Sequence, residues 1–407
     1  MNYSRIIANR LLSKKSDSIA KPVIRVSVFS IAISIMVMLV AFAIIRGFQH
    51  EVREKIIGFG SHIQIRPFNT NNSLEQPPMQ VNRDDLQALN SIEGIKAVFP
   101  FVEKGGLIKA DSSVNGVVLK GIDKNFDFSF LSKNLKEGKI LTFSDTINNG
   151  ILISQKLAST LGLGVDSPLR IYFIMPNEMQ PRGRKFTVSG IFNSGMAEFD
   201  KIYAVCDMRQ LQKLNKWGDS LASGYEILIN NFDDLPRIMS DVNNTIYYDL
   251  RATDIKTSQY QLFSWLDLLD TNVLIILILM TIVAVINIIS IILVLILERI
   301  PFIGLFKALG SGNSLIRNIF IRITMRLLLN GIIIGNVLGL GLIFIQQQFH
   351  LFPLNEEMYY LDHIPALLQW DYILGVNVGV FAISFLAIFI PALVIRNINP
   401  SLALQHK

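Results

Sequence analysis

Residues 271–297 read TNVLIILILMTIVAVINIISIILVLIL, a run of 27 residues that contains no charged side chain. A hydrocarbon core about 30 Å thick needs roughly 20 apolar residues at the helical rise, so this run is long enough to cross a membrane. Three further apolar blocks of similar character lie at residues 23–45, 327–345 and 372–395. The sequence therefore predicts an α-helical membrane protein with four transmembrane helices.

The composition agrees with a membrane location. Of the 407 residues, 51% are hydrophobic and 17% are charged, whereas soluble domains carry about 25% charged residues. The first apolar block follows basic residues, as in a secretory signal peptide, but it is too long and lacks a small-x-small cleavage pattern. We interpret it as a retained helix. The single cysteine, Cys206, excludes an internal disulfide and a thiolate metal cluster, and we expect it to be a small buried side chain.

The distribution of charge predicts the orientation of the chain. Residues 1–25, 298–326 and 396–407 together carry a net charge of +11, whereas residues 46–270 and 346–371 together carry −5. Because Lys and Arg are enriched in cytoplasmic loops, both termini and residues 298–326 are predicted to be cytoplasmic. The two acidic segments are then outside. The net charge of +6 comes from the basic residues of the segments predicted to be cytoplasmic. Because membrane orientation already explains this excess, we do not expect binding to nucleic acid.

The long outer segment has a mixed α and β pattern. A strand-helix-strand pattern occurs over residues 60–103 and again over residues 223–256, and the intervening residues 104–222 are richer in strands. Two such units on either side of an insertion predict one split α/β subdomain whose halves pair in space.

Apolar residues also continue the first helix outward. Phe48, Val52, Ile56 and Phe59 recur at intervals that place them on one helical face. Residues 258–272, SQYQLFSWLDLLDTN, precede the second span in the same way. We therefore expect two long stalk helices at the ends of residues 46–270.

The chain carries no recognisable catalytic chemistry. It has no phosphate-binding G-x-x-x-x-G-K-[ST] motif, no G-x-S-x-G motif and no histidine spacing suited to a metal. We predict no catalytic, cofactor-binding or metal-binding residues, and no enzyme activity. Within the spans, Gly331, Gly335 and Gly339 predict close helix packing, and Asn287 and Asn336 predict hydrogen bonds between helices.

Residues 298–310 read ERIPFIGLFKALG and predict a short amphipathic helix exposed to the cytoplasm. Such a helix is suited to the groove of a partner protein, although an interfacial helix lying on lipid is an alternative.

This segment resembles the coupling segment of permeases in the FtsX/MacB superfamily of ABC transporters, and more narrowly the lipoprotein-releasing (Lol) permease family of LolC/LolE type. Further similar stretches are GVVLKGID at residues 116–123, RKFTVSGIFNSGMAEFDKIYAV at residues 184–205, MYYLDHIP at residues 358–365 and IPALVIRNINPSLAL at residues 390–404. The resemblance thus extends over nearly the whole chain.

The resemblance implies a split porter-like subdomain, residues 60–103 and 223–256, interrupted by a β-rich sabre-like subdomain, residues 104–222. It also implies mechanotransmission, in which two copies of a separate ATPase subunit bind ATP and Mg, and their closure moves the stalks and the outer domains. A second permease copy or a paralogue would complete a dimer, and the sequence leaves that choice open.

The function that this family implies is extraction of lipoproteins from the bacterial inner membrane and their transfer to a periplasmic carrier. The alternatives are a related FtsX/MacB-like permease, for efflux or for control of cell-wall hydrolases, and a membrane receptor that does not transport.

Three groups of candidate residues follow. The residues expected to couple to the ATPase are Glu298, Arg299, Phe302, Gly304, Leu305, Phe306, Lys307, Ala308, Leu309 and Gly310. The family's carrier-binding hook corresponds to a loop that is shorter here, with an ordinary hairpin tip as the alternative, and its residues are Arg170, Pro176, Asn177, Met179, Pro181 and Arg184. A lipid cavity, or alternatively a dimer seam, is predicted at Val40, Ile44, Phe48, Val52, Leu266, Leu269 and Val273.

Overall fold

A computed structural model describes residues 20–68, 77–109, 114–175 and 180–392 of the chain. These residues divide into two compact units. The membrane unit contains the described residues up to Gln49, Trp265–Pro353 and the described residues from His363 onward. The outer unit contains His50–Ser264 and Leu354–Asp362.

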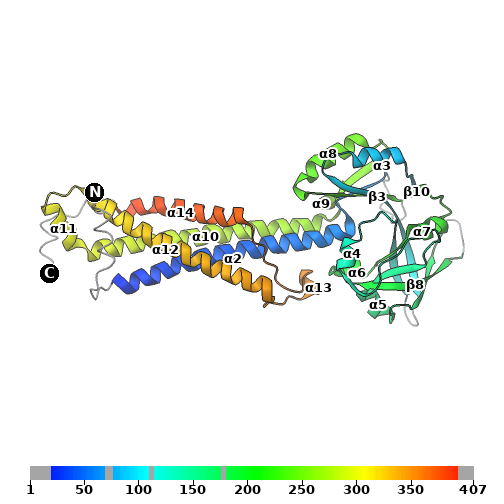
Figure 1. Ribbon diagram of the computed structural model, residues 1–407, viewed down its shortest axis with the longest axis horizontal. Coiled ribbons are helices and arrows are strands. Elements are labelled where there is room, and N and C mark those ends of the chain that lie inside the picture. The colour runs from blue at the N-terminus through cyan, green and yellow to red at the C-terminus, as the bar shows by residue number, and fades with distance from the viewer. Residues whose placement is uncertain (1–19, 69–76, 110–113, 176–179, 393–407) are drawn as a thin grey trace. The chain divides into compact units, whose positions relative to one another are not determined.

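Four long helices dominate the membrane unit and run side by side in Figure 1. They are α2 (Ala20–Gly60), α10 (Tyr260–Glu298), α12 (Asn313–Phe349) and α14 (Trp370–Ala392). Each contains a segment long and apolar enough to cross a membrane, which agrees with the predicted four spans. All four helices start before the predicted spans, by two or three residues for α2 and α14 and by more than ten for α10, which begins at Tyr260, and α12, which begins at Asn313. Because α12 begins at Asn313, residues 298–326 contain the short helix α11 (Ile300–Ala308) and the first turns of α12.

A stripe of glycines lets α12 pack closely on α2, as the sequence predicts. A methyl group at Gly331 would lie 2.7 Å from the side chain of Ile31, and one at Gly335 would lie 2.7 Å from the carbonyl oxygen of Ala32. Both glycines are buried. The absence of a side chain is therefore what allows the two backbones to approach.

Polar side chains join the helices inside the apolar unit. Asn336 of α12 and Asn377 of α14 exchange reciprocal side-chain hydrogen bonds of 2.7 and 2.9 Å. Asn287 of α10 donates to the hydroxyl of Ser30 of α2 at 2.5 Å. The prediction that Asn287 and Asn336 bond between helices is therefore confirmed. These pairs satisfy groups that would otherwise be unpaired in hydrocarbon.

The outer unit is built on one ten-stranded sheet. Its main order is β12-β1-β11-β3-β4-β9-β6-β8-β5, and β7 pairs with β3 and β8. The strands are β1 (Ile63–Pro67), β3 (Ile95–Lys109), β4 (Val114–Ile122), β5 (Leu135–Gly138), β6 (Gly150–Ser154), β7 (Pro168–Phe173), β8 (Arg182–Phe192), β9 (Tyr203–Asp207), β11 (Gly224–Ile229) and β12 (Leu250–Asp254). A separate pair joins β2 (Met79–Gln80) to β10 (Leu221–Ala222).

The order of these strands confirms a split subdomain with an insertion. Strand β1, from the first half, pairs antiparallel with β11 and β12, from the second half. Strand β3 is long enough to serve both parts, because its first portion pairs with β11 and its later portion pairs with β4 and β7. The expected boundary at residue 103 lies inside this continuous strand.

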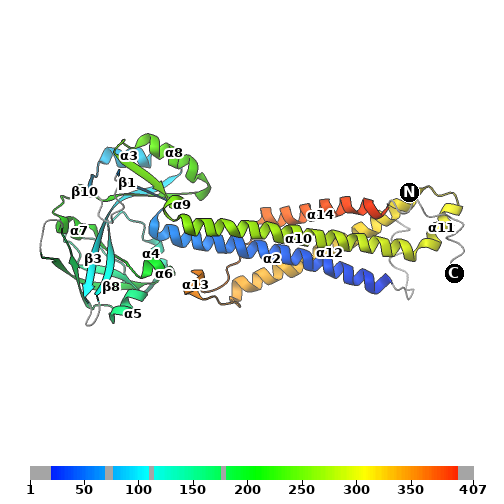
Figure 2. The ribbon, with the colours of Figure 1, turned by 180° about the vertical axis from the view of Figure 1, so that it is seen from behind.

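The outer unit also contains short helices, and local capping explains where several begin. Ser154 accepts a hydrogen bond from the backbone of Leu157, and Asp207 accepts one from Arg209, so each caps the helix that follows it. Helices α3 and α8 lie beside each other in the view from behind (Figure 2). The helices are α3 (Arg83–Asn90), α4 (Ser129–Lys133), α5 (Gln155–Leu161), α6 (Ala197–Asp200), α7 (Met208–Asn215), α8 (Leu235–Thr245), α9 (Ile255–Ser258) and α13 (Glu356–Tyr359), with a 3-10 turn η1 (Phe232–Asp234).

The last turns of α2 belong to the outer unit and lead directly into the sheet. Val52, Ile56 and Phe59 are all buried, which confirms their predicted shared face. Ser61 then adopts a left-handed conformation (φ 57°) and ends the helix. The next residue, His62, donates its backbone N–H to Ile227, and its ring Nδ1 accepts a hydrogen bond from the N–H of Ile229. His62 thereby fixes the start of β1 beside β11.

Adding one methyl group at Gly335 tests the packing of α12 on α2. Because the clash at Gly335 is with a carbonyl oxygen and not with a flexible side chain, Gly335→Ala must displace a helix, and overpacking of this kind costs about 1–3 kcal/mol. Gly341→Ala is the matched control on the same helix, since a methyl there meets nothing within 4 Å. Thermal unfolding in detergent should show a lower Tm for Gly335→Ala alone. Equal Tm values would contradict the close approach.

The pH dependence of the outer unit tests the burial of His62, which is only 9% exposed. Burial, and to a lesser extent the charge of Lys96, lowers the pKa of His62 from 6.5 to about 4. Between these values the unfolded chain binds a proton that the folded chain does not, so the free energy of unfolding falls as the pH falls, by about 3 kcal/mol in total. Urea unfolding of the full chain, followed by hydrogen exchange in β1 and β11, should show this loss. The His62→Gln variant should lack this component, and an equal loss in both proteins would be inconsistent with a neutral buried His62.

Candidate functional site

Helix α11 presents apolar side chains on its exposed side. It begins after Arg299, has Pro301 in its first turn, and is followed by Gly310 in the left-handed region (φ 84°). Ile303 and Gly304 are buried in the membrane unit, whereas 50% of Leu305 and 74% of Leu309 is exposed. The predicted helix is therefore present, with one face held by the membrane unit and an apolar face left open.

The remaining coupling candidates surround this open face. The rings of Phe302 and Phe306 pack together with their centres 4.4 Å apart. Phe306 also packs against the core of the membrane unit. Glu298, Arg299 and Lys307 are half-buried, and Ala308 is exposed. Exposed leucines next to charged groups form a surface that suits a partner protein better than water.

The predicted hook lies at the end of a hairpin formed by β7 and β8. Arg170 is opposite Lys185 in the register, and Arg184 is opposite Ile171. Arg170 and Pro181 are exposed, and Arg184 is half-buried. Pro176, Asn177 and Met179 lie outside the described residues. The hairpin thus brings the described hook residues to its two strands and to the end of the loop between them.

Arg182, which sequence reasoning missed, connects this hairpin to α7. Its guanidinium donates a hydrogen bond of 3.0 Å to the carbonyl oxygen of Leu214. The contact holds the loop end of the hairpin against α7. An arginine next to a proline-containing loop carries no local sign of such a partner, so the sequence offers no means of finding it.

The residues predicted to line a lipid cavity divide into two groups. Val52, Leu266 and Val273 are 0%, 3% and 6% exposed, so neighbours within the chain cover them and they do not face an open space. This corrects the prediction for these three. The physical reason is that these three apolar side chains pack against neighbours within their own unit. The four that remain half-buried are Val40, Ile44, Phe48 and Leu269.

Contacts between α2 and α10 within the membrane unit show how the side chains of these two helices pack. The ring of Phe48 meets the ring of Trp265 edge to face, with their centres 5.5 Å apart. Gln49 donates to the carbonyl oxygen of Leu266 at 2.9 Å and to the carboxylate of Asp270 at 3.1 Å.

Arg46 adds a link to α14 that the sequence did not indicate. It forms an ion pair of 3.5 Å with Asp270 and lies 5.1 Å above the ring of Tyr372. One guanidinium thus bridges α2, α10 and α14 at the outer ends of the spans.

The loop between α12 and α14 contributes residues to the outer unit, which the sequence did not predict. Lys55 donates to the carbonyl oxygen of Tyr360 at 2.6 Å, and its ammonium lies 4.0 Å from the carboxylate of Glu356. Asn193 also donates to both oxygens of this carboxylate. Helix α13 is therefore held by α2 and by the loop after β8.

A pocket of about 290 Å³ lies beside this contact. Burial raises the pKa of Asp200, which lines the pocket, and the charge of Glu356 acts in the same direction. The other lining residues are Gln155, Lys156, Ser159, Asn193, Gly195, Ala197 and Glu356.

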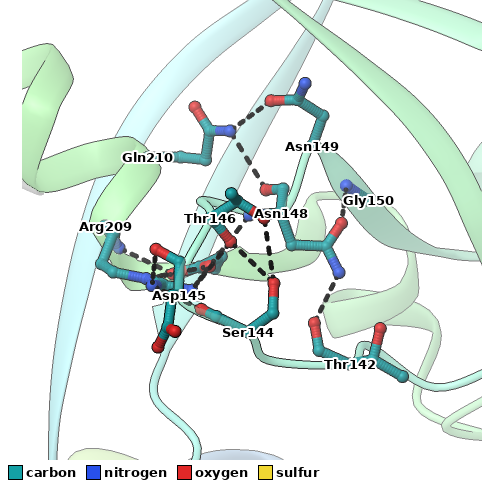
Figure 3. Close-up of polar contacts among 10 residues, drawn as sticks. Thr142, Ser144, Asp145, Thr146, Asn148, Asn149, Gly150, Arg209 and Gln210 are labelled. Atoms are coloured by element: carbon teal, nitrogen blue, oxygen red, sulfur yellow. Dashed lines mark hydrogen bonds and ion pairs between the residues drawn. The ribbon is translucent and has the colours of Figure 1, made fainter.

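Another polar cluster of the outer unit stabilises a loop. Figure 3 shows Arg209 beside the backbone of residues 144–146, and its guanidinium donates to the carbonyl oxygen of Ser144 at 2.8 Å. The same guanidinium pairs with Asp207 at 2.6 Å, and Gln210 donates to the carbonyl oxygen of Asn148 at 3.0 Å. Because these groups bind one another, we interpret the cluster as a structural support for the loop at residues 144–148.

The described residues contain no candidate metal-binding cluster, and Cys206 is buried among them. Within them, no group of three or more His, Cys, Asp or Glu side chains is placed to hold a metal ion. Burial raises the pKa of the Cys206 thiol, which keeps it protonated.

Comparison with known proteins agrees with this architecture. The model of the MacB-like periplasmic core domain matches residues 26–245, and the model of the FtsX-like permease C-terminal domain matches residues 274–400. The periplasmic region of MacB from Actinobacillus actinomycetemcomitans is 16% identical, with a TM-score of 0.34, over 51% of this chain and 95% of that one.

Two relatives align along almost the whole chain. The "Lipoprotein-releasing system transmembrane protein LolC" of Xylella fastidiosa (strain Temecula1) is 24% identical over 98% of this chain and 97% of the relative. The corresponding LolE of Haemophilus influenzae is 22% identical over 96% of each chain. The core-domain model covers more than half of the chain, and the permease model covers its helical C-terminal part. The chain therefore belongs to the permease family that combines a MacB-like periplasmic core domain with an FtsX-like permease C-terminal domain, and it is similar along its length to relatives named as lipoprotein-releasing transmembrane proteins.

Proposed function

We propose that this chain is a permease subunit of a mechanotransmission ABC transporter that extracts lipoproteins from the bacterial inner membrane and passes them to a periplasmic carrier. The observation that carries the proposal is the alignment with relatives named as lipoprotein-releasing transmembrane proteins, which extends over 98% of the chain. It includes both the outer unit and all four long helices, so the similarity is not confined to a shared membrane segment.

In this proposal both termini and α11 are cytoplasmic and the outer unit is periplasmic. The supporting argument is the charge asymmetry, since Lys and Arg predominate in residues 1–25 and 298–326 and are absent from residues 346–371. The outer unit then lies where a lipoprotein and its carrier are present.

ATP hydrolysis is assigned to a separate subunit. The sequence has no phosphate-binding loop, whereas α11 exposes Leu305 and Leu309 on the proposed cytoplasmic side. Two copies of the ATPase, each with ATP and Mg, would engage α11 of this chain and of a second permease copy or paralogue. The groove-binding mode of an amphipathic helix suits this contact.

The acyl chains of the substrate need an apolar shelter during extraction. Transfer of each buried CH₂ group into water costs about 0.8 kcal/mol, so a diacyl anchor cannot be lifted through water alone. We assign this shelter to the half-buried Val40, Ile44 and Phe48 of α2 and Leu269 of α10. The β7–β8 hairpin with Arg170 and Pro181 is the proposed contact for the carrier.

The α11 surface is tested with the double variant Leu305→Asp and Leu309→Asp. Two charges on an apolar docking face must be desolvated on binding, so we expect the partner ATPase to be lost on co-purification. Leu351→Asp with Phe352→Asp is the matched control, because these exposed apolar residues lie on the proposed periplasmic side. The control should retain the ATPase. Retention by both variants would exclude α11 as the coupling site.

Release itself is tested with the complete transporter in vesicles that contain a fluorescent diacylated lipoprotein. ATP should transfer the lipoprotein to soluble carrier, and Val40→Trp or Ile44→Trp should block transfer while ATP hydrolysis continues, since added bulk fills the shelter. A lipoprotein that lacks its acyl chains is the control, and it should not stimulate hydrolysis. If the wild-type transporter hydrolyses ATP but never releases the lipoprotein, the related efflux or hydrolase-regulating permeases become the better assignment.

A further inference from the structure

Lys120 of β4 joins three segments of the outer unit that are far apart in the sequence. Its ammonium donates to the carbonyl oxygen of Phe59, in the last turn of α2, at 2.7 Å. It also lies 2.7 Å from the carboxylate of Glu226 on β11. Only 4% of the Lys120 side chain and 1% of the Glu226 side chain is exposed, so this arrangement is shielded from water. One buried cation therefore contacts the stalk helix, the insertion and the second half of the split subdomain.

The carbonyl that Lys120 binds is one that the helix itself cannot satisfy. The last four carbonyl groups of an α-helix lack partners within the helix, and the helix dipole makes this end negative. A lysine ammonium is a suitable cap for such an end. Lys120 supplies that cap from the sheet, so the bond fastens the end of α2 to β4.

The ring of Phe59 is held in the same place. Its centre lies 5.0 Å from that of Tyr203 and 5.1 Å from that of Phe199, and the ammonium of Lys120 lies 5.3 Å away. Phe192 stacks nearby at 6.4 Å. These aromatic residues all belong to the insertion, which thus holds both the backbone and the side chain of the last turn of α2.

Glu226 continues the connection to the strand that follows α2. Its Oε1 accepts a hydrogen bond of 3.0 Å from Gln64 of β1, which is also its partner in the register. Its Oε2 is buried without a hydrogen-bond partner among the described residues. A buried ion pair with an unsatisfied oxygen adds little net stability, because desolvation offsets the attraction. The role of this ion pair is better explained by the fixed positions that it gives to the end of α2, β4 and β11.

We propose that Lys120 is a positioning residue that anchors the outer end of α2 to the sheet, so that displacement of α2 moves both the split subdomain and its insertion. This inference rests on the proposed mechanotransmission function. Without the anchor, α2 is still connected to β1 through the chain, but its last turn is free to fray or rotate. The motion of the helix would then be lost at the junction and would not reach the insertion.

The test compares K120M/E226Q with E226Q. The double variant removes both charges, keeps the approximate shape of both side chains and leaves an acceptor for Gln64. It therefore avoids the uncompensated buried charge that K120M alone would leave. E226Q is the control, because it retains the bond from Lys120 to the carbonyl of Phe59 while removing the carboxylate, so that any effect of losing the ion pair itself, including the uncompensated charge left on Lys120, appears in E226Q as well.

The first measurement is hydrogen exchange in the full chain without the ATPase. Loss of a hydrogen bond to a charged group should make amides in the last turn of α2 exchange about tenfold faster in K120M/E226Q than in E226Q. The β3 and β4 amides should be unchanged in both. Unchanged exchange at the end of α2, or an equal loss throughout the sheet, would overturn the anchor.

The second measurement is the amount of lipoprotein released per ATP hydrolysed by the complete transporter. We expect this ratio to be lower in K120M/E226Q than in E226Q, while both hydrolyse ATP. An unchanged ratio in the double variant would overturn the role in transmission. If the wild-type transporter releases nothing, the proposed function fails, and hydrogen exchange still decides whether Lys120 holds α2.

Discussion

The continuous backbone of α2 is the constraint on which both units depend. In hydrocarbon a chain must satisfy its own backbone hydrogen bonds, and an α-helix does so within one segment. Helix α2 keeps this arrangement from Ala20 to Gly60, so the helix that packs against the glycines of α12 also supplies Val52, Ile56 and Phe59 to the core of the outer unit. One helix therefore has to be stable both in the hydrocarbon of the membrane and in the aqueous surroundings of the outer unit.

The two units satisfy their buried polar groups by different means. In the membrane unit Asn336 and Asn377 form a neutral reciprocal amide pair, and the Arg46–Asp270 ion pair is only partly buried. In the outer unit a full ion pair, Lys120 with Glu226, is buried at the end of α2. A charge is expensive inside a bilayer, whereas in a protein core a partner, a helix end and aromatic faces can compensate it together. The location of the charged anchor in the outer unit is consistent with these physical limits.

The described surfaces favour a protein that acts through its contacts. Leu305 and Leu309 leave an apolar face on α11, and the β7–β8 hairpin exposes Arg170. Energy supplied by a partner at α11 would have to travel along helices, so the junctions where the helices end are as important as the binding surfaces. This is why a hydrogen bond to the carbonyl of Phe59 has mechanical importance in the proposed function.

The sequence by itself determined the features that depend on local periodicity and composition. Four apolar blocks identified the membrane helices, the spacing of Val52, Ile56 and Phe59 identified a buried face, and Gly331 and Gly335 identified a close helix contact. These predictions succeeded because each depends on neighbours within a few turns of the same helix. The strand-helix-strand repeats likewise indicated that two distant halves would pair.

Only the tertiary structure decided which distant residues meet. Lys120 and Glu226 lie on strands separated by the rest of the insertion, and no local pattern distinguishes them from solvated charges. The same is true of Glu356, whose segment lies in the outer unit, and of Leu266 and Val273, which the chain itself covers. Periodicity shows which face of an element is apolar, but the partner of that face is set by the order of strands and the packing of helices, which arise from the whole chain.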